Sequence, residues 1–276
     1  HGPFSHLFES VVPDGARHED WSERILLDEG TEIHRVLKRL DPELPQRVVR
    51  LIHGEHELPY LARAVSGTFD VDRCDYLLRD AHFTGVNYGK FELDWLLRSF
   101  CHSASREVGG APALSIDGTK GLPAIESFIL ARLFMFQQVY FHKASRASEW
   151  LLGRILARVC QLVLDEHSLP DIPAGLRDLA KTGDTSLGNY LALDDSVLWT
   201  ALPRFAESSD PVLADLAARL LGRKLFKAFE LFGDDATPAG RERCLELARE
   251  LARAHRLDAD FYVGLDVPSI STFDDS

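Results

Sequence analysis

The residues best suited to chemistry lie in one short segment, residues 69–86, with the sequence FDVDRCDYLLRDAHFTGV. Its apolar spacing predicts a helix. Several polar or aromatic residues three or four positions apart share one broad face of that helix: Asp72, Arg73, Tyr76, Arg79, Asp80 and Phe83. A carboxylate can bind a cation, and arginine can bind phosphate through its fork of donors. The segment therefore predicts a site for a cation and an anionic substrate, with an ion-paired surface helix as the alternative.

A second polar group lies at the start of the chain. It consists of His1, His6, Glu9, His18 and Glu19. His6 and Glu9 are three positions apart, so a helix would turn both to the same side. Histidine and carboxylate together suit proton transfer or metal ligation. The alternative is that His6 fills space beside the neighbouring phenylalanines.

A third group interrupts an apolar and aromatic run at residues 130–146. Its polar members are Arg132, Tyr140, His142, Lys143 and Arg146. Arg132 and Tyr140 are two helical turns apart, so we expect them on the same wall of a pocket. Lys143 and Arg146 also fit an ordinary solvated edge, Arg146 more than Lys143. Apolar neighbours exclude water and so strengthen any phosphate contact made here.

Other classes of site find no support in the 276 residues. We see no glycine-rich phosphate loop, GxSxG elbow or dinucleotide fingerprint. His53 and His56 are interpreted as surface histidines. The four cysteines form no CxxC pair, which favours a reducing cytoplasm. No apolar run approaches the roughly 20 residues of a membrane helix, and the net charge of −12 argues against a general nucleic-acid surface.

The fold that must position these groups is predicted to be mainly α. Helices are expected at 21–27, 32–40, 45–53, 58–64, 69–84, 91–103, 124–163 and within 194–255, where two begin at Asp194 and Asp210. Gly109-Gly110 and Asp117-Gly118 predict a small β-hairpin within 105–118. Residues 165–190 are expected to be loop-rich, and a strand is expected to begin at 261–263.

The chain resembles the HD-domain phosphohydrolases, most closely their deoxynucleoside triphosphate (dNTP) triphosphohydrolase branch. The resemblance rests on HGPFSHLFE, HEDWSERIL, DVDRCDYLLRDAHFTGV, GLPAIESFILAR and QQVYFHK, which occur in the family's order. It is strong over residues 1–165 and weak beyond. It implies a helical-bundle core at 1–165, incomplete at its N-terminus, with a small β-hairpin, and a C-terminal helical region at 166–276.

The resemblance also implies a role for each candidate residue. Asp72 matches a ligand of a divalent metal, for which Mn, Mg, Fe, Ni and Zn are not distinguished. The family's His-Asp pair would lie just upstream of His1, so we expect the natural protein to extend further. His1, His6, Glu9 and His18 match catalytic positions, with His6 as the acid that protonates the leaving oxygen. The substrate-binding positions matched are Arg73, Tyr76, Asp80, Arg132, Tyr140, His142 and Lys143.

The function implied by the resemblance is metal-dependent hydrolysis of dNTPs to deoxynucleoside and inorganic triphosphate. The resemblance further implies a homo-oligomer, and we expect a cytoplasmic protein with no membrane contact. Two alternatives stay open. One is an HD phosphohydrolase acting on another nucleotide or phosphoester. The other is a non-catalytic regulatory or binding module, because three of the family's four metal ligands are missing from this sequence.

Overall fold

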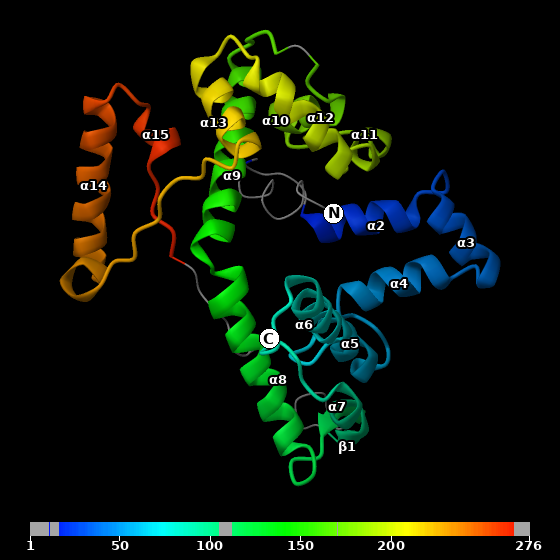
Figure 1. Ribbon diagram of the computed structural model, residues 1–276. Coiled ribbons are helices and arrows are strands. Elements are labelled where there is room, and N and C mark those ends of the chain that lie inside the picture. Colours follow the sequence, from blue (N-terminus) through cyan, green and yellow to red (C-terminus); the bar gives the residue numbers. More distant parts are fainter. Residues whose placement is uncertain (1–10, 12–16, 105–111, 170, 268–276) are drawn as a thin grey trace. The chain divides into compact units, whose positions relative to one another are not determined.

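The computed structural model describes residue 11 and residues 17–104, 112–169 and 171–267. Within them the chain is mainly α, which confirms the predicted class, and one two-stranded sheet is present (Figure 1). The helices are α2 (His18–Leu27), α3 (Glu32–Leu40), α4 (Leu44–Ile52), α5 (Pro59–Ser66), α6 (Val71–Thr84), α7 (Leu93–Ser99), α8 (Leu122–Met135), η2 (Phe136–Tyr140), α9 (Lys143–Leu164), α10 (Ala174–Thr182), α11 (Leu187–Leu191), α12 (Asp195–Ala206), α13 (Pro211–Leu221), η3 (Gly233–Ala236), α14 (Pro238–Ala254) and α15 (Ala259–Tyr262). The strands are β1 (Phe100–Ala104) and β2 (Pro112–Ile116).

The chain forms two compact units. The first unit is Glu19–His142, and the second contains residues 143–267. The domain boundary predicted after residue 165 falls inside the second unit, just after α9. A division of function at that point stays a prediction.

Four short helices open the first unit, and all four were expected from the sequence. Their ends differ from the predicted ones by up to three residues. Thr31 caps α3 by accepting a hydrogen bond from the backbone N–H of His34 at 3.2 Å. Pro45 and Pro59 stand in the first turns of α4 and α5, where a helix does not need their missing N–H. Local sequence signals therefore suffice to set these helices.

The small hairpin is confirmed, but its first strand lies earlier than predicted. β1 and β2 pair antiparallel, with Phe100 opposite Ile116. The helix predicted to run to Ser103 is wrong beyond Ser99. The Ser99 carbonyl accepts a hydrogen bond from the Asp117 N–H at 2.9 Å, so the chain leaves the helix there to pair with β2. This partner lies more than ten residues along the chain, which a local pattern does not reveal.

The long helix predicted from Ala124 to Val163 is present with an interruption. α8 ends at Met135 and passes into the π-helix η2, in which the N–H of Phe141 donates to the carbonyl of Phe136 at 2.7 Å. Phe141 and His142 then lie outside any helix before α9 begins.

The second unit is built on α9, whose apolar residues are buried. The side chains of Leu151, Ile155, Leu156 and Val159 have no exposed surface. Helices α10 and α13 pack against α9, and α12 packs against α13. Asp194 caps α12 and Asp210 caps α13, which confirms both predicted helix starts.

Two predictions in the second unit need correction. The segment 165–190 is loop at 165–169, 171–173 and 183–186, but it also contains α10 and all but the last residue of α11. Pro173 and Gly183 mark the ends of α10 instead of breaking it, while Leu176 and Leu179 are buried. The strand expected at 261–263 overlaps α15. The Asp258 side chain starts that helix by accepting a hydrogen bond from the backbone N–H of Asp260 at 3.1 Å.

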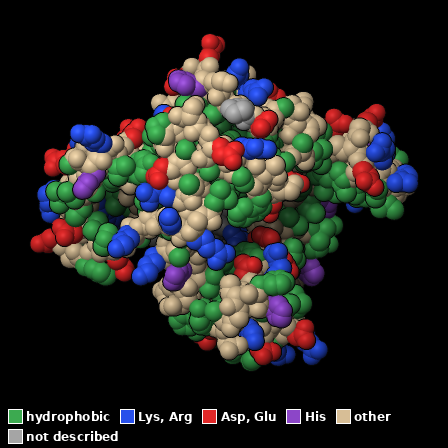
Figure 2. All heavy atoms as spheres, turned by 45° about the horizontal axis from the view of Figure 1, so that its top comes forward, with side chains coloured by type: hydrophobic (Ala, Val, Ile, Leu, Met, Phe, Trp, Pro, Cys, Tyr) green, Lys and Arg blue, Asp and Glu red, His purple; other side chains and the backbone are tan. Residues whose placement is uncertain are grey.

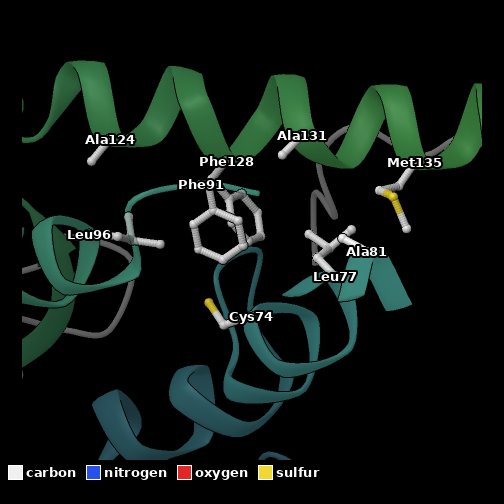
Figure 3. Packing of buried hydrophobic residues seen from close by; sticks show 9 residues of the cluster. All are labelled: Cys74, Leu77, Ala81, Phe91, Leu96, Ala124, Phe128, Ala131 and Met135. Carbon is white, nitrogen blue, oxygen red and sulfur yellow. The ribbon is translucent and has the colours of Figure 1, made fainter. Parts of the chain in front are cut away.

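The core of the first unit joins α6 to α8. Figure 3 shows the α8 side chains pointing toward those of α6 and the following segment. The cluster consists of Cys74, Leu77, Ala81, Phe91, Leu96, Ala124, Phe128, Ala131 and Met135. The rings of Phe91 and Phe128 meet edge to face at 5.0 Å. The core thereby holds one face of α6 and leaves its other face for polar residues.

The surface carries both charge signs. On the face seen in Figure 2, acidic and basic side chains are interspersed among hydrophobic ones. The described part of the chain contains no helix long and apolar enough to cross a membrane. All four cysteines are free thiols, and Cys74 and Cys160 are buried. Burial raises the pKa of each of these two thiols to about 11, so they are protonated at neutral pH.

Candidate active site

Helix α6 carries the central part of the candidate site. The Asp70 side chain caps its N-terminus, and Gly85 ends it in the left-handed conformation at φ 75°. Cys74, Leu77 and Ala81 point into the core (Figure 3). The predicted helix is thus confirmed, and the core fixes how its polar face is turned.

The polar face divides into half-buried and exposed positions. Arg73, Tyr76 and Asp80 are half-buried, whereas Asp72 and Arg79 are exposed. Arg79 forms an ion pair with Asp75 at 3.0 Å, and both side chains are more than half exposed. That pair matches the alternative of an ion-paired surface helix. The half-buried residues instead form specific contacts with other elements.

Two side chains from other elements approach Tyr76 and Asp80 of α6. The Tyr140 hydroxyl of η2 donates a hydrogen bond to Asp80 Oδ2 at 2.8 Å. The rings of Tyr140 and Tyr76 meet edge to face with their centroids 6.1 Å apart. Arg132 of α8 lies close enough to Tyr76 for its positive charge to lower the pKa of that phenol. The structure therefore brings together four of the predicted substrate-binding residues.

The surroundings of the two tyrosines favour their neutral forms. Burial raises the pKa of Tyr76, and the positive charges of Arg132 and Arg73 partly offset this rise. Burial also raises the pKa of Tyr140, as do its hydrogen bond to Asp80 and the negative charge of that carboxylate. Both phenols can therefore act as hydrogen-bond donors at neutral pH.

The π-helix explains how Arg132 and Tyr140 reach the same place. In an α-helix of 3.6 residues per turn, eight positions turn two side chains about 80° away from each other. A π-turn rotates less per residue, so η2 reduces this angle and turns Tyr140 toward the side of Arg132. Counting two helical turns predicts the shared wall, but the π-turn is what aligns the two side chains.

Arg73 is held at the start of α6. Its guanidinium Nη1 lies 2.7 Å from Asp70 Oδ2 and also donates to the carbonyl oxygen of Gly67. Its backbone N–H donates to Asp70 Oδ1 at 2.6 Å. Burial raises the pKa of Asp70, and the contacts with Arg73 oppose that rise. Asp70 is not among the residues predicted from the sequence to have a role, although an Asp directly before a helical run is a recognisable N-cap signal.

The described residues do not make up a metal site. Among them no group of three or more His, Cys, Asp or Glu side chains could hold a metal ion. Asp72 is exposed on the first turn of α6. One carboxylate does not retain a transition metal against water. Asp72 is thus a single candidate ligand, which does not make a metal site among the described residues.

The structure describes the other candidates only in part. His1, His6 and Glu9 lie outside the described residues. His18 is the first residue of α2 and is half-buried. His142 and Lys143 are exposed at the junction between η2 and α9. Their catalytic and substrate-binding roles stay predictions.

Three further side chains have structural contacts. His53 Nε2 lies 3.0 Å from the carboxylate of Glu23, and His56 Nδ1 accepts a hydrogen bond from the Leu58 N–H at 3.1 Å. Arg146 is not an ordinary solvated residue. Its guanidinium binds both oxygens of the Asp266 carboxylate at 2.8 and 2.6 Å, and so ties α9 to the segment after α15.

Comparison with known proteins gives relatives but no match to a family model. The chain is 31% identical over 274 residues to the uncharacterised protein YwfO of Bacillus subtilis, which is 99% of this chain and 59% of that protein. It is 22% identical over 289 residues to the deoxynucleoside triphosphate triphosphohydrolase SAMHD1 of Danio rerio, which is 92% of this chain and 44% of that protein.

A solved structure is also similar. The crystal structure of a phosphohydrolase (BT4208) from Bacteroides thetaiotaomicron matches with a TM-score of 0.71 and 28% sequence identity, over 95% of this chain and 62% of that one. The chain thus spans less than two thirds of each of these three proteins. Together the similarities support a relationship of this chain to the HD phosphohydrolase superfamily. They do not single out the dNTP triphosphohydrolase branch.

Proposed function

We propose that this chain, whose relatives support a phosphohydrolase of the HD superfamily, hydrolyses dNTPs to deoxynucleoside and inorganic triphosphate. The observation that carries the proposal is the meeting of Arg132 and Tyr140 with Tyr76 and Asp80. One cation, two neutral phenols and one carboxylate suit a ligand that has both a phosphate and a sugar.

Each side chain has a role that follows from its chemistry. Arg132 binds a phosphate oxygen through its fork of donors. Asp80 Oδ2 already accepts a hydrogen bond from Tyr140, and within the described part of the chain Oδ1 accepts none. Oδ1 can therefore accept a hydrogen bond from a sugar hydroxyl. The Tyr76 ring beside it would crowd a 2′-hydroxyl and so favour deoxyribose.

Arg73 supplies the second cation for the triphosphate in this proposal. Arg73 directly follows Asp72 in the first turn of α6. A phosphate bound by Arg73 would therefore lie near the proposed metal ligand Asp72. His6 is the proposed acid for the leaving oxygen, with His1, His18 and Glu9 in supporting roles. A divalent metal, a homo-oligomer and a cytoplasmic location remain part of the proposal.

The test is turnover of a nucleotide panel with phosphate, pyrophosphate and triphosphate separated. We expect triphosphate as the main product and faster turnover of dNTPs than of ribonucleotides. Tyr76→Ala should narrow this preference, whereas Asp75→Asn, an exposed change on the same helix, should leave it unchanged. Pyrophosphate or monophosphate as the main product would instead identify an HD phosphohydrolase with another reaction.

A further inference from the structure

Asp70 is a buried carboxylate in direct contact with Arg73, a residue of the proposed phosphate-binding face. Asp70 is 5% exposed, and both of its carboxylate oxygens bind Arg73. Oδ1 accepts a hydrogen bond from the backbone N–H of Arg73, and Oδ2 pairs with the Arg73 guanidinium. An N-cap needs only the first of these bonds, which Ser, Thr or Asn could also supply. Burying a full negative charge is costly, so the second bond calls for its own explanation.

Gly67 completes the arrangement on the other side of the guanidinium. Its carbonyl oxygen accepts from Arg73 Nη1 and, at 3.3 Å, from the backbone N–H of Asp70. A Cβ atom at position 67 would collide with the carbonyl oxygen of Arg63, so only glycine allows this close passage of the chain. The corner between α5 and α6 is thus built around the Arg73 side chain.

We propose that Asp70 is a positioning residue, which acts by holding Arg73 and the first turn of α6 in the geometry that phosphate binding requires. The inference rests on the proposed function, since it takes Arg73 as a phosphate contact. A guanidinium held by a buried carboxylate and a backbone carbonyl has lost most of its rotamer freedom before the ligand arrives. Asp72 lies in the same first turn of α6, two positions after the N-cap Asp70, so the cap also orients the backbone of Asp72.

The direction in which one substitution changes the affinity for triphosphate distinguishes a positioning role from simple helix capping. Asp70→Asn keeps an oxygen for the cap but removes one negative charge near the proposed anion site. Coulomb attraction alone would then tighten the binding of a polyanion. A positioning role predicts the opposite, because a released Arg73 samples other rotamers. We expect affinity for inorganic triphosphate to fall roughly tenfold, the effect of losing one charge-assisted hydrogen bond.

The experiment measures inorganic triphosphate binding by calorimetry at one fixed concentration of divalent ion. Asp75→Asn is the matched control, since it makes the same charge change on the same helix at an exposed ion pair. Two further variants, Arg73→Gln and the double variant Asp70→Asn/Arg73→Gln, test whether Asp70 affects triphosphate binding through Arg73. If Asp70 acts through Arg73, the double variant should bind as weakly as Arg73→Gln alone.

Loss of binding through misfolding is distinguished from loss of binding through a released Arg73 by two further measurements. Thermal melting of each variant is recorded, and Asp70→Ser offers a second variant that keeps the cap without the charge. Weaker binding in both Asp70 variants, with the α6 helix retained, supports the proposal. Unchanged or tighter binding in Asp70→Asn, as in Asp75→Asn, would overturn it and leave the proposed function standing.

The proposed function can also fail by itself. If triphosphate binds and depends on Asp70 but turnover releases a different product, the reaction is wrong and the positioning role holds. If the unaltered chain binds no triphosphate at all, Arg73 is not a phosphate contact, and both proposals are refuted.

Discussion

The hydrogen bond between Tyr140 and Asp80 joins η2 to α6 in the candidate site. Tyr140→Phe removes only the hydroxyl that lies 2.8 Å from Asp80 Oδ2. The ring stays, and with it the edge-to-face contacts to Tyr76 at 6.1 Å and to Phe136 at 5.1 Å. The change therefore tests the hydrogen bond with little effect on packing.

The size of the effect follows from the surroundings of the pair. A hydrogen bond to a charged group contributes about 1.5–3 kcal/mol when it is buried. Tyr140 and Asp80 are both half-buried, so water can replace part of the lost bond at the carboxylate. We therefore expect the free energy of unfolding of the first unit to fall by about 1 kcal/mol.

The measurement is urea unfolding followed by hydrogen exchange in peptides from α6 and α8, which report on the first unit alone. Tyr88→Phe is the control, because the Tyr88 hydroxyl lies on a partly exposed residue in the same unit. It should change the unfolding free energy by less than about 0.5 kcal/mol, as surface substitutions do. Equal stability of the two variants would refute the hydrogen bond as a stabilising contact.

Further predictions concern the core and the response to pH. Leu77→Ala, at a fully buried position, should destabilise the first unit by about 2–5 kcal/mol in the same unfolding assay. The hydrogen bond from Arg158 lowers the pKa of Asp210, so this pair stabilises the second unit above about pH 4 and its contribution is lost as the pH falls further. Asp210→Asn should reduce the fall in melting temperature as the pH drops below about 4. An unchanged fall would contradict this role of the Arg158–Asp210 pair. The pKa of Tyr140 is raised, so its contribution to stability is lost above about pH 10. Tyr140→Phe should reduce the alkaline loss and remove one late-titrating phenol from the absorbance at 295 nm, and an unchanged titration would contradict this.

The parts of the fold that sequence patterns predicted well share one property. Their ends carry local signals, such as the caps Asp194 and Asp210 or the proline in the first turn of α8. A cap acts on backbone groups within three residues, so a short window of sequence contains all the information. The wrong elements lack this property. β1 forms because residues 112–116 pair with it, and no signal within 100–104 announces that partner.

For the candidate site, the sequence by itself determined which residue types are present and which of them share a face of α6. It also determined the resemblance to HD phosphohydrolases, because that depends on motifs. Tertiary structure alone decided that Asp80 binds Tyr140, sixty positions away, whereas the partners of Arg73, Asp70 and Gly67, lie only three and six positions before it. The physical reason is that side-chain partners are chosen by packing and by a π-turn in η2, and neither follows from the spacing of residues along the chain.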